Sequence, residues 1–320
     1  MKSLYRFFSI AAGAFFLYYF IHLFDELPKI KLNEILSKLN YFYVFGSLFA
    51  YLLSHVLRAI RFAVLLGRQD FSLFKLVYLQ FYTNAINLIF PFKLGEVYRI
   101  VAFNKLIKDD KKLILTVVTE KTLDLLLLFA WALVAILLLG KEIVALNIVL
   151  WILSFLITGS LILFFVLPEN IRTFNIFIAK RYNSKLTNTI LSLTDKIMRV
   201  IANIKTTLKN NFSTITLLTC SIWLFEVLGF CYLLPFMVEK SQVWLVSILV
   251  FLSSLIPSAS LGLGGLQLGF SAMENHTNAF NSLIISLTYQ AFIFAPAVVF
   301  GFILYLFVNL KKKSSNQSVR

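Results

Sequence analysis

The sequence predicts an all-α fold of the polytopic membrane class. Hydrophobic residues make up 59% of the 320 residues and charged residues only 14%, and the mean hydropathy is +0.84, which is far from the balance of a soluble domain. Several apolar stretches reach the roughly 20 residues that an α-helix needs to cross hydrocarbon. No stretch alternates apolar and polar residues as the strands of a membrane barrel do, so helices are the expected elements.

The apolar stretches predict the number of elements within a single membrane domain, residues 1–320. Full crossings are expected at residues 4–24, 41–66, 113–139, 143–167, 213–237 and 281–309. The first of these is too long for a signal-peptide core and lacks a small-residue cleavage site, so we expect a retained helix. Two further stretches, 71–92 and 243–270, are apolar but interrupted by proline and glycine.

The basic residues predict the orientation of the chain. The net charge is +15, and the basic residues gather at residues 99–112, at residues 168–212 and in the C-terminal tail. Their position between apolar stretches indicates the positive-inside bias of membrane proteins and argues against a nucleic-acid partner. We expect both termini to be cytoplasmic, and the links at 140–142 and 238–242, which carry one lysine and one glutamate each, to lie outside.

The interrupted stretches resolve a conflict in this topology. If every stretch crossed once, the basic residues at 99–112 would lie on the wrong side. We therefore predict six full crossings and two re-entrant hairpins, one at 71–92 entering from the cytoplasm and one at 243–270 entering from outside. The opposite orientations suggest an inverted repeat of residues 41–139 and 213–309, as in transporters. Eight plain crossings are the alternative.

Ionisable residues inside apolar stretches are the main functional signal, because each is costly in a membrane unless it is paired or hydrated. Arg58 and Arg61 lie three residues apart on one helical face. Glu120 and Asp124 lie four apart on another helix, so we expect them to pair with the arginines. Two alternatives are that the arginines extend to the interface, which suits Arg61 better than Arg58, and that the pair only fixes helix register.

Polar residues and helix breaks also mark the two hairpins, where a broken backbone is tolerated only beside protein or a polar cavity. The first hairpin carries a polar face and a charged end, comprising Gln80, Asn84, Asn87, Pro91, Lys93, Gly95, Glu96 and Arg99. Lys93 and Arg99, with the start of a new helix, are expected to form an anion site. The second hairpin carries the breaks Pro257, Gly262, Gly264 and Gly265 and the polar residue Gln267.

Other residues complete the candidate site. Glu226 lies alone near the middle of 213–237, where it is either neutral and bonded to a hairpin group such as Ser258, Ser260 or Gln267, or titrates during transport. Residues 168–212 are expected to form amphipathic helices on the cytoplasmic leaflet. The sequence shows no zinc, Walker or serine-hydrolase motif, so we expect no metal and no cofactor, and transport is favoured over catalysis.

These motifs resemble the flippase-like membrane domain family that includes the transmembrane region of bacterial lysylphosphatidylglycerol synthases. The resemblance rests on "LRAIRFAVLL", "PFKLGEVYR", "TEKTLD" and "IPSASLGLGGLQ", and covers nearly the whole chain. Its most specific element is matched by Pro91, Gly95, Glu96 and Arg99. Two positions depart from the family pattern: Gln267 stands where a glutamate is usual, and Lys121 where an arginine is common.

The resemblance implies a lipid translocase in the bacterial cytoplasmic membrane, moving an anionic or polar-headgroup lipid between leaflets. The lipid would be a phospholipid or an isoprenoid-linked lipid, with Arg58, Arg61, Lys93 and Arg99 meeting its headgroup. The soluble aminoacyl-transferase domain of the synthases is not seen in this sequence, so we expect no aminoacylation by this chain alone, and a lipid-modifying synthase is an expected partner. The alternative is a membrane subunit of an enzyme acting on polyprenyl-phosphate sugars or aminoacylated phospholipid.

Overall fold

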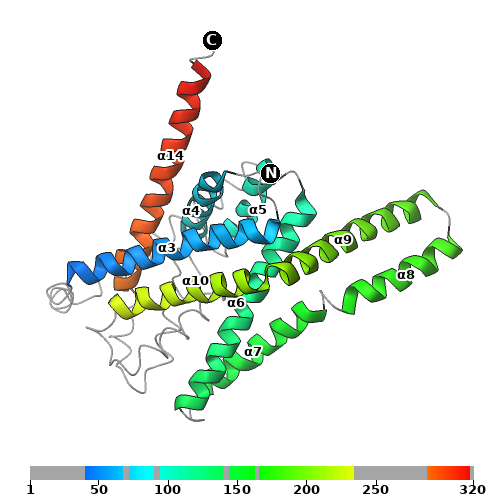
Figure 1. Ribbon diagram of the computed structural model, residues 1–320, viewed down its shortest axis with the longest axis horizontal. Coiled ribbons are helices and arrows are strands. Elements are labelled where there is room, and N and C mark those ends of the chain that lie inside the picture. The colour runs from blue at the N-terminus through cyan, green and yellow to red at the C-terminus, as the bar shows by residue number, and fades with distance from the viewer. Residues whose placement is uncertain are drawn as a thin grey trace, which may run out of the picture. The chain divides into compact units, whose positions relative to one another are not determined.

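The computed structural model describes residues 40–67, 72–89, 94–107, 109–139, 144–162, 166–182, 184–233 and 287–317. Every regular element in these ranges is helical, which confirms the all-α prediction (Figure 1). The elements are α3 (Tyr41–Leu66), α4 (Leu73–Ile89), α5 (Leu94–Ile107), α6 (Asp110–Leu139), α7 (Val144–Leu161), α8 (Leu167–Arg181), α9 (Lys185–Asn210), α10 (Phe212–Leu233), the π-helix η4 (Gln290–Phe294) and α14 (Ala295–Gln317).

Three of the described helices are long and apolar enough to cross a membrane. They are Tyr41–Leu66, Phe212–Leu233 and Leu287–Val308, which lie in three of the six predicted crossings. Large apolar side chains such as Phe42, Phe45 and Phe49 are exposed along α3, as expected where lipid replaces water as the solvent. The predicted crossings 113–139 and 143–167 are helical in the structure, as α6 and α7, but they are not among these three helices. Residues 4–24 and 243–270 lie outside the described ranges, and the count of six crossings and two hairpins stays a prediction.

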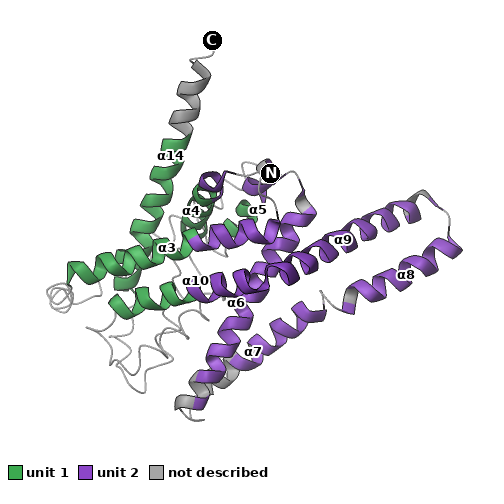
Figure 2. Ribbon diagram, viewed as in Figure 1, with its two compact units in different colours: residues 1–56, 77–99, 222–320 green, residues 57–76, 100–221 purple. Residues whose placement is uncertain are grey.

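The contacts divide the chain into two compact units, coloured separately in Figure 2. Unit 1 comprises residues 1–56, 77–99 and 222–320, and unit 2 comprises residues 57–76 and 100–221. The boundaries fall within α3, α4, α5 and α10, so each unit is assembled from separate stretches of sequence. The units do not coincide with the ranges 41–139 and 213–309, and the inverted repeat stays a prediction.

Small residues allow the helices of unit 1 to approach closely, as is common between membrane helices. Ser47 of α3 donates a hydrogen bond of 2.6 Å to the carbonyl of Gly229 of α10. A Cβ atom on Gly229 would lie 3.3 Å from the carbonyl oxygen of Ser47, so the contact leaves little space for a side chain. A Cβ on Gly301 of α14 would likewise lie 2.7 Å from the carbonyl oxygen of Phe81 of α4.

Helices α4 and α5 form an antiparallel pair, and their contacts lie in unit 1. A Cβ on Gly95, at the start of α5, would overlap the backbone of Asn87, near the end of α4. Tyr98 lies about one turn after Gly95 on α5, and Tyr82 lies more than one turn before Asn87 on α4. The ring centroids of these two tyrosines are 5.7 Å apart. The chain therefore turns back between α4 and α5. The bounds predicted for the first hairpin, residues 71–92, are wrong, because α4 is one continuous helix over most of that range and the returning segment is α5. Pro91 and Lys93 lie outside the described residues, and the entry of this pair into the membrane stays a prediction.

The π-helix η4 departs from the uninterrupted helix expected over residues 281–309. The amide of Ala295 donates to the carbonyl of Gln290, a spacing of five residues. Pro296 follows immediately and has no amide hydrogen, so regular α-helical bonding cannot continue through that position. The widened turn is the local consequence, and such turns recur at functional sites.

Unit 2 contains a helical hairpin and an apolar contact that hold α8 and α9 in place. Ile201 and Ile204 of α9 are buried, and Leu115 and Val118 of α6 pack against them. The side-chain amide of Asn175 in α8 donates to the hydroxyl of Thr194 in α9 at 2.8 Å. The prediction of helices within residues 168–212 is confirmed, whereas their position on the cytoplasmic leaflet stays a prediction.

Candidate functional site

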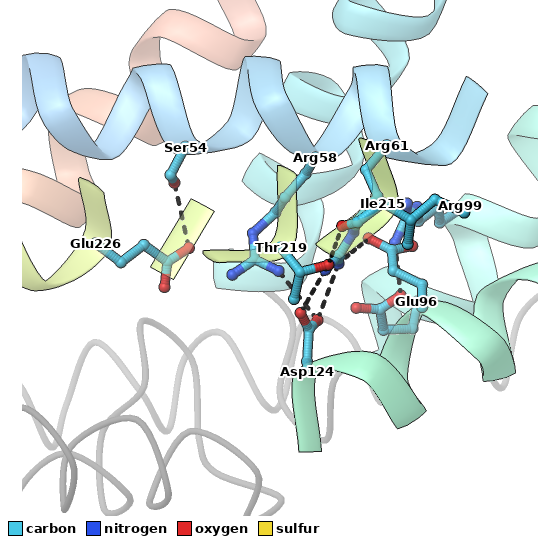
Figure 3. Close-up of polar contacts among 10 residues, drawn as sticks. Ser54, Arg58, Arg61, Glu96, Arg99, Asp124, Ile215, Thr219 and Glu226 are labelled. Carbon is cyan, nitrogen blue, oxygen red and sulfur yellow. Dashed lines mark hydrogen bonds and ion pairs between the residues drawn. The ribbon is translucent and has the colours of Figure 1, made fainter. Parts of the chain in front are cut away.

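A cluster of buried charges in unit 2 joins the arginines of α3 to the carboxylates of α6 (Figure 3). Nη1 of Arg61 donates to Oδ1 of Asp124 at 2.8 Å, and Nη2 donates to Oδ2 of the same carboxylate at 3.2 Å. Nη2 of Arg61 also lies 3.2 Å from Oε1 of Glu120. Nη1 of Arg58 reaches Oδ2 of Asp124 at 3.2 Å. The pairing that the sequence predicts between these two helical faces is confirmed.

The spacing of the charged residues on their helices produces this geometry. Arg58 and Arg61 are three residues apart on α3, and Glu120 and Asp124 are four apart on α6, so each pair projects from one helical face. Asp124 then meets Arg61 through both of its oxygens, the two-point contact that suits a planar guanidinium and a carboxylate. The cluster contains two cations and two anions, so their charges compensate one another.

The structure does not support the alternative in which Arg61 extends to the membrane interface. The sequence made Arg61 the better candidate to extend to the interface, but its side chain is 0% exposed and bound by both carboxylates. Arg58, expected to lie deeper, is 13% exposed. Depth along α3 is therefore not what decides burial, because the position of the carboxylates on α6 determines which guanidinium is enclosed.

Thr219 of α10 is a further member of the cluster and was not predicted from the sequence. Its hydroxyl accepts a hydrogen bond from Nη1 of Arg61 at 3.1 Å, and it donates to the carbonyl of Ile215 at 2.8 Å. A threonine in an apolar helix commonly bonds to the carbonyl one turn earlier. Because this local hydrogen bond already accounts for a threonine in an apolar helix, the sequence does not predict its contact with Arg61.

Glu226 of α10 lies in unit 1, where its partner comes from α3. The hydroxyl of Ser54 lies 3.2 Å from Oε1 of Glu226, as the dashed line in Figure 3 shows, and 2.8 Å from the carbonyl oxygen of Tyr51. A partner in the second hairpin was one of the two expectations for Glu226, but Ser258, Ser260 and Gln267 lie outside the described residues. Ser54 was not identified, because a serine among apolar residues has many alternative partners.

The predicted polar face of α4 is also in unit 1 and is largely turned away from the surface. Gln80 is buried, while Asn84 and Asn87 are partly buried. The side-chain amide of Asn84 donates to the hydroxyl of Tyr51 at 3.2 Å. Within the described ranges, Oε1 of Gln80 and Oδ1 of Asn87 are buried and meet no hydrogen-bond donor. A buried amide oxygen without a donor is costly, so these two oxygens are ready to accept hydrogen bonds.

The charged end of the first hairpin contains a short-range ion pair. Nη1 of Arg99 lies 3.6 Å from Oε2 of Glu96, three residues earlier on α5. Glu96 lies in the first turn of α5, where a negative charge is favoured by the helix dipole. Arg99 is buried, and a buried guanidinium requires such compensation. Lys93, the third charged residue expected here, lies outside the described residues.

Among the described residues, the cysteines form no disulfide and the potential metal ligands form no metal-binding group. Cys220 and Cys231 are free, and the first is exposed whereas the second is half-buried. Within the described part of the chain, no group of three or more His, Cys, Asp or Glu side chains could hold a metal ion.

Long apolar helices with compensated charges between them define an integral membrane protein of the helical class. The chain belongs to the family described as the lysylphosphatidylglycerol synthase TM region, whose model matches residues 6–301. The family resemblance of its sequence motifs is thereby confirmed, and membership indicates a function connected with membrane lipids. Neither the curated proteins nor the solved structures provide a match to this chain.

Proposed function

We propose that this protein is a lipid translocase that moves an anionic or polar-headgroup lipid between the leaflets of the membrane. The observation that carries the proposal is the charge cluster of Arg58, Arg61, Glu120 and Asp124 on helices of a membrane protein. Ionisable side chains inside membrane helices commonly mark substrate or ion pathways. A bacterial cytoplasmic membrane with both termini inside is part of the proposal.

The two arginines have different roles in this mechanism. Arg61 is enclosed and holds both carboxylates, so it keeps α3 and α6 in register. Arg58 is the more exposed cation and shares Asp124 with Arg61. A headgroup phosphate that approaches Arg58 can therefore replace one oxygen of Asp124 while Arg61 continues to compensate that carboxylate.

This exchange addresses the main energetic obstacle to lipid crossing. Removing a phosphate from water without partners is prohibitive, whereas charge-assisted hydrogen bonds to a guanidinium offset much of that cost. When no lipid is bound, Asp124 forms an ion pair with the guanidinium of Arg58, so that neither charge is left uncompensated. The site is thus stable both with and without its ligand.

The polar groups of unit 1 support the same proposal. Gln80 and Asn87 present buried amide oxygens that lack a donor within the described residues, and a headgroup amine or hydroxyl would supply one. Arg99, paired with Glu96 on α5, offers a second guanidinium for a phosphate. Lys93 belongs to the proposed headgroup site on the basis of its sequence position alone.

A leaflet-exchange experiment tests the proposal. The full chain is reconstituted into liposomes with fluorescent lipids of different headgroups, and their accessibility to a membrane-impermeant quencher is followed over time. We expect faster crossing of anionic lipids, lost in Arg58→Ala and in Arg99→Ala. Arg172→Ala removes an exposed arginine of α8 and serves as the matched control. Arg58→Lys should give partial activity, because lysine keeps the charge but not the planar fork.

The outcomes separate the proposal from its alternatives. If no lipid crosses faster than in empty liposomes, although the protein is inserted and folded, the translocase proposal is wrong. Turnover of a labelled polyprenyl-phosphate sugar by the purified protein would then support an enzyme subunit. Normal crossing in both arginine variants would keep translocation and overturn the assignment of the site.

A further inference from the structure

Unit 2 also carries a basic groove on its surface, formed by residues other than the buried arginines and carboxylates of the charge cluster. It is a surface groove of about 640 Å³ where the start of α6 meets the N-terminal half of α9. The groove is lined by Lys111, Ser184, Asn188, Thr189, Ser192, Leu193 and Lys196. The proposed translocation mechanism uses none of these residues.

The groove follows from the register of two helices. Ser184, Asn188, Ser192 and Lys196 recur at intervals of four, so they lie along one face that begins at the N-cap of α9. Leu115, one turn after Lys111, packs against the buried residues of α9 and so places that lysine beside the groove.

The electrostatics of the groove favour an anion. The described residues that line it include two lysines and no carboxylate. Asp195 is the only acidic residue in α9, and its carboxylate lies 3.4 Å from the side-chain amide of Asn175 on α8. Ser184 caps α9 by accepting a hydrogen bond from the amide of Thr187 at 3.1 Å, so the positive end of a long helix also borders the groove.

We infer that this groove binds the phosphate of an anionic membrane lipid. The lysines supply charge, and the hydroxyl and amide groups supply additional hydrogen-bond donors, which together suit a phosphate ester. Leu193 lines the same groove and is 47% exposed, and the apolar Ile190 lies exposed beside Thr189. A groove that combines phosphate-binding groups with exposed apolar side chains fits a lipid, with its acyl chains, better than free phosphate.

The surrounding helices fit the same ligand. Phe174, Phe177 and Tyr182 are exposed on and just after α8. Residues 168–212 contain basic side chains at eight positions and acidic side chains at two. Exposed aromatic residues next to many lysines and arginines are typical of helices that lie on an anionic leaflet. The site therefore anchors α8 and α9 to lipid headgroups, whether or not the protein moves lipids between leaflets.

Lipid retention by the full-length protein tests this inference. Purified protein in detergent is mixed with phosphatidylglycerol or phosphatidylcholine, and the bound lipids are counted by native mass spectrometry. We expect retention of phosphatidylglycerol to be weakened on the order of tenfold in Lys111→Gln/Lys196→Gln, which corresponds to about 1.4 kcal/mol for the loss of both lysines. The control Lys75→Gln/Lys105→Gln removes the same charge from exposed positions outside both the groove and residues 168–212, and should retain the lipid.

Further measurements distinguish a lipid from a soluble phosphate ester as the ligand of the groove. They also distinguish this inference from the proposal of lipid translocation. Glycerol phosphate should compete poorly, and equal competition by this soluble ester would overturn the assignment to a lipid. Equal loss of lipid in the groove and control variants would show a diffuse charge effect and would also overturn it. Both variants should keep the thermal midpoint of the unmodified protein. Because retention is measured without transport, it remains decisive even if the leaflet-exchange experiment shows no translocation.

Discussion

At the scale of single residues, the buried guanidinium of Arg61 is the centre of the charge cluster. It contacts two carboxylates and a threonine hydroxyl contributed by α6 and α10. Compensated pairs of this kind contribute little net stability compared with apolar packing, but removing one partner leaves a buried charge. The cluster is therefore sensitive to any change that alters only one of its members.

Asp124→Ala should be among the most damaging substitutions in the chain. It removes the two-point partner of Arg61 and the contact of Arg58, and we expect a loss of about 3–5 kcal/mol in the free energy of unfolding. Thermal unfolding in detergent or nanodiscs measures the effect. Glu169→Ala, which removes a carboxylate from the exposed start of α8, is the control and should change little. Equal stability of the two variants would contradict the structural role of the cluster.

Glu226→Gln should preserve stability, whereas Glu226→Leu should not. The Ser54 hydroxyl has one hydrogen but lies near two oxygens, those of Tyr51 and Glu226, so a hydrogen supplied by residue 226 would satisfy both contacts. Glutamine supplies such a hydrogen and keeps the shape of the side chain, whereas leucine removes the polar contact of residue 226 with the buried Ser54 hydroxyl. The measurement is the thermal midpoint of each variant. A large loss in Glu226→Gln would indicate that the charged form is required.

At the scale of elements, the close approach of α4 and α5 depends on a glycine. The backbone of Asn87 occupies the space that a side chain at Gly95 would need, so the two helices can pair only without a Cβ there. The "PFKLGEVYR" motif thus has a packing reason for its glycine in addition to any role in an anion site.

Gly95→Ala should separate α4 from α5 and destabilise the protein by about 1–3 kcal/mol, the usual cost of forcing atoms into a packed contact. The matched control is Gly159→Ala in α7, where no atom lies within 4 Å of the added Cβ. That substitution should be neutral or stabilising by about 0.5–1 kcal/mol, because alanine favours helix. Thermal unfolding of both variants decides the matter, and a tolerated Gly95→Ala would show that the contact is not tight.

At the scale of the whole molecule, the topology remains the central prediction. The turn between α4 and α5 is present, but its relation to the membrane depends on the sides on which its flanking residues lie. Ser72 precedes α4 and Lys105 lies near the end of α5, and both are exposed. A re-entrant hairpin places them on one side, whereas a plain crossing by α4 places them on opposite sides.

Cysteine accessibility tests this topology in a background without Cys220 and Cys231. We expect Ser72→Cys, Lys105→Cys and Lys180→Cys to react with a membrane-impermeant thiol reagent only from the cytoplasmic side. Lys141→Cys, in a link predicted to lie outside, should react only from the other side. Labelling of Ser72→Cys and Lys105→Cys from opposite sides would replace the re-entrant hairpin with a crossing helix.

Much of the site was predictable because ionisable groups in apolar helices have few ways to be accommodated. The spacing of Arg58, Arg61, Glu120 and Asp124 predicted two complementary faces, and the structure joins them. The partners Thr219 and Ser54 were not predictable, since a hydroxyl in an apolar helix has a local alternative in the preceding turn.

The sequence by itself determined the membrane class, the helical elements and the lipid-related family, because hydropathy, charge spacing and local motifs act over one or two helical turns. Only the tertiary structure decided that Arg61 rather than Arg58 is enclosed, that Ser54 meets Glu226, and that a basic groove forms beside α9. These features depend on the register of helices distant in sequence. That register is determined by close packing of small and apolar residues between helices, and the residue pattern of a single helix does not predict it.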